Sequence, residues 1–83
     1  MGERKKTPTE AFGEVLQELR AERRLTQEAL ALDAGTERSH ISALERAEKG
    51  PSLATIFRLA GALGVPAGEL IARVERRLTN KKP

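Results

Sequence analysis

The chain lacks cysteine, tryptophan and tyrosine, and its 83 residues include one histidine and two phenylalanines. Without cysteine the chain forms no disulfide and no thiolate metal site. The scarcity of aromatic residues disfavours the stacking platforms that bind single-stranded nucleic acids. One histidine, with no cysteine or tyrosine, provides poorly for catalysis. We therefore expect no enzyme, no metal and no cofactor.

A long hydrophobic run is also missing. The start, MGERKKTPTE, has no apolar stretch like that of a signal peptide, and no segment approaches the ~20 apolar residues that span a membrane. The length suits one small domain. We expect that domain over residues 7–78, between a basic N-terminal tail at 1–6 and a basic C-terminal tail at 79–83.

The net charge of +3 is concentrated at the two ends of the chain. Residues 1–6 carry a charge of +2 and residues 73–83 a charge of +4, whereas residues 7–72 carry −3. Such basic ends are either solvated tails or contacts for phosphate groups. An acidic row at a spacing of four is expected to be a solvated face, and it consists of Glu10, Glu14, Glu18 and Glu22.

Apolar residues recur at helical spacing, and no segment alternates as a strand does. Thr7 and Glu10 form a capping box at the start of the first helix. The second helix is expected over 27–34, and the recognition helix described below over 37–47. The fold is therefore predicted to be all-α, with five helices.

Glycine, serine and proline mark the remaining helix boundaries. Thr26 caps the second helix and Gly35 ends it, because glycine adopts the left-handed conformation at little cost. Ser52 caps the fourth helix, Gly64 stops it, and Pro66 begins the fifth. The apolar face of the fourth helix is expected to comprise Leu53, Ile56, Leu59, Ala60 and Leu63.

The strongest signal lies in residues 27–46, QEALALDAGTERSHISALER. Two short helices joined by a tight glycine turn are typical of a helix-turn-helix motif. Ala31 is small where the helices cross, Gly35 makes the turn, and Ile41 and Leu44 lock the second helix against the first. Further matching segments are Leu19-Arg20, Leu25-Thr26-Gln27-Glu28, Leu30-Ala31, Leu44-Glu45-Arg46, Pro51-Ser52-Leu53 and Leu63-Gly64-Val65.

Over residues 12–72 the chain resembles the phage-repressor-like helix-turn-helix family of the Cro/CI or Xre type. The resemblance implies a compact, lambda-repressor-like domain of five helices that binds double-stranded operator DNA. It also implies a homodimer on a palindromic operator, in the cytoplasm of a bacterium and encoded by a plasmid or phage, that usually represses transcription.

The resemblance assigns DNA contacts to the motif and its flanks. Base contacts are implied for Arg38, Ser39, Ser42 and Ala43, and an arginine there can bind guanine O6 and N7 through two hydrogen bonds. The alternative for Arg38 is a solvated or phosphate-bound side chain, and for His40 a simple surface position. Contacts to the DNA backbone are implied for Gln27, His40, Arg46, Lys49, Ser52 and Thr55.

Arg20 and Glu45 match a pair that forms a salt bridge between helices in this family. Two residues depart from the family pattern. Glu37 stands where a small capping residue is usual, so Thr36 could cap the third helix instead. Ala47 replaces a common glycine, which would allow that helix to run longer.

Several alternatives remain open at this point. Residues 37–42 also resemble controller proteins of restriction–modification systems, and an autoregulating antitoxin is a further option. Outside this class, the acidic middle of the chain favours a helical protein-interaction module without DNA binding. A dimer interface is expected on the fifth helix, ringed by Arg73, Arg76 and Arg77 and consisting of Leu70, Ile71, Val74 and Leu78.

Overall fold

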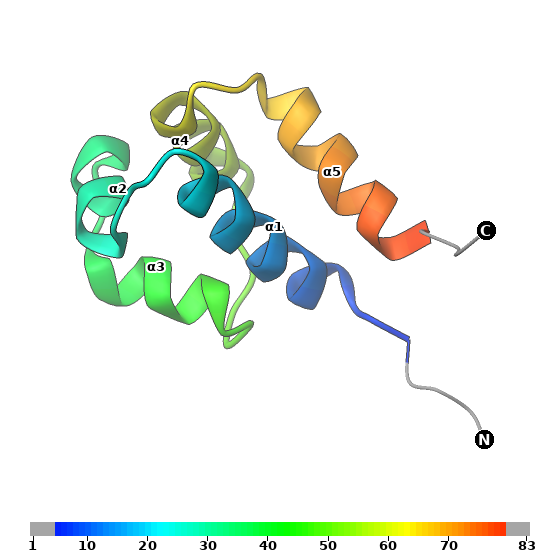
Figure 1. Cartoon of the computed structure of the whole chain (residues 1–83). Coiled ribbons are helices and arrows are strands. Elements are labelled where there is room, and N and C mark those ends of the chain that lie inside the picture. The colour runs from blue at the N-terminus through cyan, green and yellow to red at the C-terminus, as the bar shows by residue number, and fades with distance from the viewer. Residues whose placement is uncertain (1–4, 80–83) are drawn as a thin grey trace.

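The computed structural model describes residues 5–79 of the chain, and this part contains five helices. They are α1 (Pro8–Glu22), α2 (Gln27–Ala34), α3 (Arg38–Glu45), α4 (Leu53–Leu63) and α5 (Ala67–Thr79). Helix α1 runs through the middle, with α2 and α3 on one side and α5 along the other (Figure 1). The predicted five-helix, all-α fold is confirmed. Most of both basic tails, including Arg4, Lys81 and Lys82, lies outside the described residues.

The helix ends follow the predicted local chemistry. The Thr7 hydroxyl accepts a hydrogen bond from the Glu10 amide at 3.1 Å, and the Glu10 carboxylate accepts one from the Thr7 amide at 3.0 Å. Thr26 and Ser52 cap α2 and α4 through side-chain oxygens. Helices α2 and α4 end at Gly35 and Gly64, both left-handed with φ of 73°, so these predictions from the sequence are confirmed.

Helix α3 is shorter than predicted. It spans Arg38–Glu45 instead of 37–47, and the chain turns at Ala47, where φ is +60°. Alanine therefore occupies the left-handed conformation that glycine adopts more cheaply, so losing the glycine did not lengthen the helix. The N-cap is Glu37, without a side-chain hydrogen bond to the backbone. Thr36 is not the cap, and its hydroxyl instead pairs with His40.

The hydrophobic core lies where the five helices meet. Its largest fully buried side chains are Leu16, Leu19, Leu30, Ile41, Leu44, Leu59, Leu63, Leu70 and Val15. The prediction for Leu53 was wrong, because this side chain is 70% exposed. Within residues 5–79 no single helix is long and apolar enough to cross a membrane. Helices α4 and α5 meet that criterion only as a pair, bent by 104°.

Gly13 brings α1 and α3 into close contact. A Cβ atom at Gly13 would lie 2.7 Å from the Leu44 carbonyl oxygen and 2.8 Å from that of Glu45. These are backbone atoms, so α3 itself would have to shift. Gly13 is therefore a condition for the observed position of α3, and the apolar pattern of the sequence does not reveal it.

We expect Gly13→Ala to destabilise the fold by about 1–2 kcal/mol, because overpacking outweighs the higher helix propensity of alanine. Thermal unfolding followed by circular dichroism measures the effect. Gly68→Ala in α5 is the matched control, because its Cβ would meet nothing within 4 Å. Equal melting temperatures for both variants would contradict the close contact.

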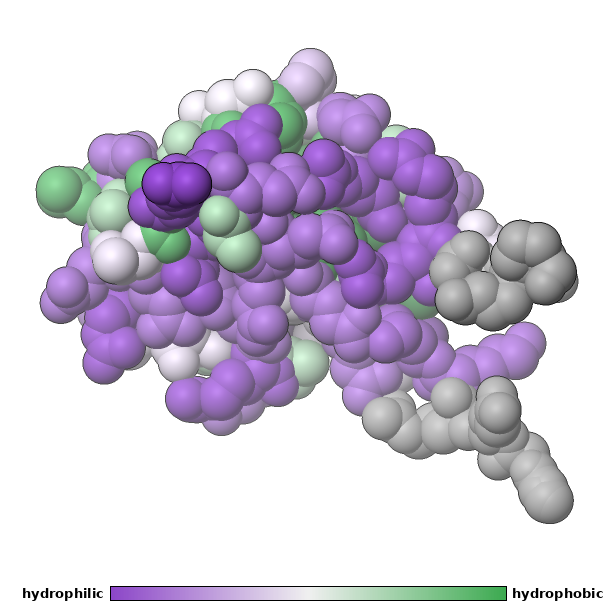
Figure 2. Space-filling model, in the orientation of Figure 1, coloured by the Kyte–Doolittle hydropathy of each residue, from purple (hydrophilic) through white to green (hydrophobic). Residues whose placement is uncertain are grey.

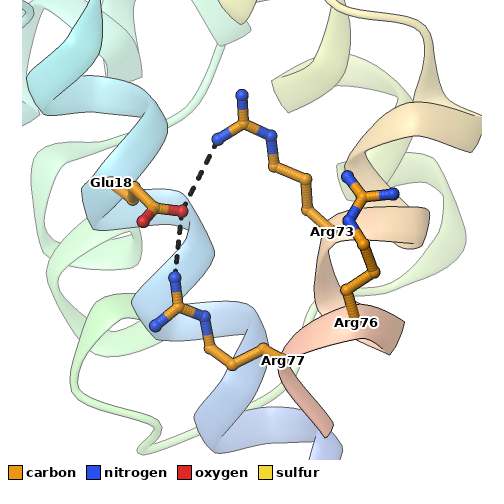
Figure 3. A pocket seen from close by; sticks show the side chains of 4 residues that line it. All are labelled: Glu18, Arg73, Arg76 and Arg77. Atoms are coloured by element: carbon orange, nitrogen blue, oxygen red, sulfur yellow. Dashed lines mark ion pairs between the residues drawn. The ribbon is translucent and has the colours of Figure 1, made fainter. Parts of the chain in front are cut away.

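The acidic row on α1 is not a plain solvated face. Glu14 lies 3.2 Å from Arg77, Glu18 lies 2.9 Å from Arg77 and 3.5 Å from Arg73, and Glu22 lies 3.1 Å from Arg73. Figure 3 shows Glu18 of α1 between Arg73 and Arg77 of α5. These contacts form an ionic clasp that fastens α5 to α1.

The clasp changes the role of the C-terminal arginines. Arg73 and Arg77 are engaged by α1, and Arg76 lies 3.1 Å from Glu69 on its own helix. All three therefore carry partners within the chain, whereas the sequence suggested a free basic end or the rim of an interface. The positive charge of these three arginines is offset locally.

Acid should weaken the clasp. A hydrogen bond from Lys6 holds the pKa of Glu14 below its ordinary value of 4.5, and a hydrogen bond from Arg73 does the same for the pKa of Glu22. A carboxylate with a depressed pKa in the folded state stabilises the fold above its unfolded pKa. That contribution is lost as the pH falls below about 4.5 through the folded pKa.

We therefore expect the melting temperature to fall as the pH drops from about 5 to about 3, the range in which carboxylates usually titrate. The variant Arg73→Gln should melt lower than the wild type at pH 7 and show a shallower decline with acid. Calorimetry across this pH range measures both. Parallel pH profiles for the two proteins would show that the clasp contributes nothing.

Helix α5 exposes less apolar surface than the sequence suggested. Leu70 is fully buried and Val74 is 8% exposed, so both belong to the core of the single chain. Ile71 and Leu78 are 42% and 36% exposed. Of the four residues expected at a dimer interface, only these two are available to a partner.

Candidate nucleic-acid interface

Helices α2 and α3 form the predicted helix-turn-helix. The turn begins at Gly35, whose left-handed backbone lets α3 fold back against α2. Ile41 and Leu44 are fully buried against the core. The candidate base-contacting residues lie away from that buried side, Arg38 and Ser39 being exposed and Ser42 and Ala43 half-buried.

A chain of polar contacts links α1 to the start of α3. Arg20 donates from Nε to Glu45 Oε2 at 2.7 Å and from Nη2 to Glu45 Oε1 at 3.0 Å. A third bond runs from Arg20 Nη1 to the Leu25 carbonyl oxygen at 2.9 Å. The expected ion pair is therefore present, and it engages both carboxylate oxygens of Glu45, whose side chain is 3% exposed. The Glu45 hydrogen bond raises the pKa of Arg20.

Gln27 extends this chain to the surface. Its Nε2 donates to Glu45 Oε1 at 2.9 Å, and its Oε1 accepts from Arg38 Nη1 at 3.2 Å. Because a carboxylate only accepts hydrogen bonds, it holds the amide nitrogen inward and leaves the amide oxygen for Arg38. The guanidinium of Arg38 is thereby oriented by a buried charge through one intervening side chain.

His40 is held from within the motif. Its Nδ1 lies 2.8 Å from the Thr36 hydroxyl. This contact fixes the ring and leaves Nε2 as the nitrogen for an outside partner. Within residues 5–79 no cluster of three or more histidine and acidic residues could hold a metal ion.

The candidate contacts to the DNA backbone after α3 differ in whether their side chains already have a partner within the chain. Arg46 pairs with Glu48 at 2.9 Å, so part of its positive charge is offset. Lys49 is exposed. Ser52 caps α4 and its hydroxyl donates to Thr55 Oγ1 at 3.0 Å. Ser52, at the N-terminus of α4, follows Lys49 by three residues in the chain. A helix attracts anions at this end.

The contacts of Thr36 with His40 and of Glu45 with Gln27 could not be predicted from the sequence. The Thr36–His40 pair has a spacing of four residues, which is a usable signal only once the helix boundary is known. The Glu45–Gln27 bond joins residues 18 positions apart. A buried acid facing two hydrogen-bond donors on other helices leaves no periodic trace in the sequence.

Figure 2 shows a mostly hydrophilic face, with hydrophobic surface confined to small patches, the clearest at its left and upper edges. Three open pockets within residues 5–79 are lined largely by charged or polar side chains. On this surface Arg38 is exposed at the start of α3.

Comparison with known proteins agrees with this geometry. A family model described as helix-turn-helix matches residues 16–70. The immunity repressor protein of Bacillus phage phi105 is 39% identical over 59 residues, covering 71% of this chain and 41% of that protein. The transcriptional repressor RghR of Bacillus subtilis is 47% identical over 58 residues, covering 69% of this chain and 43% of RghR.

A solved structure is similar over nearly its whole length. The restriction–modification controller protein C.AhdI from Aeromonas hydrophila is 40% identical, with a TM-score of 0.72, covering 75% of this chain and 94% of that one. The chain spans less than half of the phage and Bacillus repressors named above. The family match covers most of the five-helix fold, and the chain belongs to the Xre-type helix-turn-helix family of DNA-binding transcription regulators.

Proposed function

We propose that the chain binds a palindromic operator as a homodimer, with α3 in the major groove, and represses transcription by occupying a promoter. The observation that carries this proposal is the polar chain that ends at Arg38. A buried carboxylate presents the guanidinium at the exposed start of α3, where an arginine can bind guanine O6 and N7. Ser39, Ser42 and Ala43 share this surface and would complete the base contacts.

The phosphate contacts would flank the base contacts. Gln27 and His40 have polar atoms at the edge of the motif, and Arg46, Lys49, Ser52 and Thr55 lie after α3. Such contacts fix register and orientation on the duplex without reading sequence. The clasp on α5 is consistent with this arrangement, because it engages the acidic residues of α1 that would repel DNA. A regulator of this kind acts on DNA in the bacterial cytoplasm.

A restriction–modification controller is the second candidate function. The similarity to C.AhdI favours it, because the match extends over 94% of that protein. Such a controller would bind DNA through the same surface. The two candidates therefore differ in the promoter they regulate and not in the DNA-binding surface.

The salt dependence of binding to random duplex DNA tests whether the chain binds DNA at all. Each phosphate that a lysine or arginine neutralises releases about one counterion, so Arg46 and Lys49 on both copies of a dimer give a slope of roughly −4 in log K against log salt. A helical protein-interaction module without DNA binding would show no such slope. We expect such a slope, reduced by about one unit for each bound copy in Lys49→Ala.

A further inference from the structure

His40 lies at one edge of the side of α3 that is proposed to face DNA. Successive residues of a helix are turned by about 100°. Ser39 therefore lies in the middle of the side opposite the buried Ile41 and Leu44, with Arg38 on one edge and His40 on the other. A helix in the major groove has a phosphate backbone on either side, so a short side chain at its edge is placed to meet a phosphate.

The hydroxyl of Thr36 contacts His40 from the turn before α3. Its Oγ1 lies 2.8 Å from Nδ1 of the ring. Either the hydroxyl donates to Nδ1, or an Nδ1–H group donates to the hydroxyl. Within residues 5–79 the Thr36 side chain has no other hydrogen-bond partner. The first arrangement thus satisfies both groups within the chain, whereas the second leaves the hydroxyl hydrogen to solvent.

The direction of this hydrogen bond decides what the outer ring nitrogen can do. A neutral imidazole carries one hydrogen, on either Nδ1 or Nε2, and the hydrogen bond of one nitrogen sets the state of the other. If Nδ1 accepts from Thr36, the hydrogen is on Nε2, which can then donate to an anion. With the hydrogen on Nδ1, the neutral ring would present only an acceptor at Nε2, and a phosphate oxygen would find no donor there.

No ion pair fixes the imidazole in its place. Helices α1 and α2 pack against α3. The charged groups on these elements are the acidic row and Arg20 on α1, Glu28 and Asp33 on α2, and Glu37, Arg38 and Glu45 on α3 and its N-cap. None of them forms an ion pair with His40 within residues 5–79. In this part of the chain Thr36 is therefore the side chain that sets which ring nitrogen carries the hydrogen.

We propose that Thr36 is a positioning residue for DNA binding, whose hydroxyl donates to Nδ1 of His40 and fixes the tautomer in which Nε2–H donates to a phosphate oxygen of the duplex. This inference rests on the DNA binding proposed above, and it adds a residue that acts through His40. Because the donor is an uncharged ring, the contact orients the protein on the duplex without neutralising a phosphate.

Nitrogen-15 NMR of the imidazole tests the tautomer directly. His40 is the only histidine in the chain, so in a protein without a histidine tag its ring signals are unambiguous. At pH 8, where an ordinary imidazole is neutral, we expect a protonated Nε2 and an unprotonated Nδ1. Thr36→Ser keeps the hydroxyl and should give the same pattern, whereas Thr36→Val should raise the share of the other tautomer. A wild-type ring protonated mainly on Nδ1 overturns the inference.

Binding to random duplex DNA tests the function of the contact. At pH 8 we expect His40→Ala and Thr36→Val each to weaken binding by about two- to tenfold per bound copy, the net contribution of one hydrogen bond. The double variant should lose no more than His40→Ala alone, because both changes remove the same contact. Thr36→Ser should bind like the wild type. Thermal unfolding of each variant controls for a loss of fold.

Two further measurements separate positioning from a structural role. At pH 6 a larger share of imidazole carries a hydrogen on both nitrogens, so the deficit of Thr36→Val should be smaller than at pH 8. At pH 8, His40→Ala should leave the salt slope of binding unchanged, because an uncharged donor releases no counterion. Lys49→Ala is the matched control, because it removes a charge and should lower that slope.

The inference is overturned if Thr36→Val binds DNA like the wild type at pH 8, if Thr36→Ser loses as much affinity as Thr36→Val, or if the deficit of Thr36→Val is equal at both pH values. A loss in His40→Ala that depends on the sequence of the duplex would mean that His40 contacts a base, which contradicts the phosphate contact. A wild-type chain without affinity for duplex DNA overturns the proposed function and this inference with it. DNA binding that is indifferent to Thr36 overturns this inference alone.

Discussion

Replacing Glu45 with alanine should destabilise the folded chain by about 3–5 kcal/mol, the cost of breaking a buried ion pair by removing one partner. Glu45 is nearly inaccessible, with a side-chain exposure of 3%, and Arg20 is 22% exposed. The substitution leaves the guanidinium of Arg20 without two of its three hydrogen bonds. For a small domain this is a large share of the total stability.

Chemical denaturation measures this effect, with Glu48→Ala as the matched control. Glu48 also pairs with an arginine, but both members of that pair are more than half exposed, and surface ion pairs contribute little. Glu48→Ala should therefore leave the midpoint nearly unchanged. An equal shift for the two variants would mean that burial of the Arg20–Glu45 pair has no energetic consequence.

Replacing Arg38 with alanine should weaken binding to the best operator by about 1–3 kcal/mol and relax the preference at one base pair. The physical reason is the loss of a bidentate contact to guanine. Competition binding against operators varied at each position measures both effects. A uniform loss of affinity across all operator sequences would mean that Arg38 contacts a phosphate and not a base.

Gln27→Ala removes both the amide that orients Arg38 and a proposed phosphate contact. Without the amide, Glu45 no longer orients Arg38, although the guanidinium itself remains. We expect an intermediate loss of affinity with the same base preference, and the charge-preserving Arg38→Lys should lose that preference, because lysine lacks the bidentate fork. Full retention of discrimination by Arg38→Lys would contradict a bidentate contact.

The sequence predicts the fold well where local chemistry decides it. Caps at Thr7, Thr26 and Ser52, and left-handed glycines at Gly35 and Gly64, are properties of a few neighbouring residues. The end of α3 escaped prediction because alanine at position 47 accepts a left-handed backbone that its propensity opposes. Backbone hydrogen bonds from the Ala47 amide to the Leu44 carbonyl oxygen and from the Glu48 amide to the Ala43 carbonyl oxygen close the helix there.

Long-range partners could not be predicted from periodicity. The spacing of Glu14, Glu18 and Glu22 marks one face of α1, but it does not tell whether water or α5 covers that face. The same limit applies to Val74. Its place in an apolar stripe was predicted correctly, but the side chain packs into the core of its own chain and not against a second copy. Arg20 and Glu45 were identified only through the family resemblance, and the link to Gln27 required the structure.

Selection of binding sites from a random duplex library tests the account most directly. We expect enrichment of an inverted repeat, with half-sites about one helical turn, or ~34 Å, apart. Each half-site should contain a guanine whose enrichment disappears when the selection is repeated with Arg38→Ala. No enriched sequence, or an unpaired site that Arg38→Ala selects equally well, would contradict a dimer that reads its operator through α3.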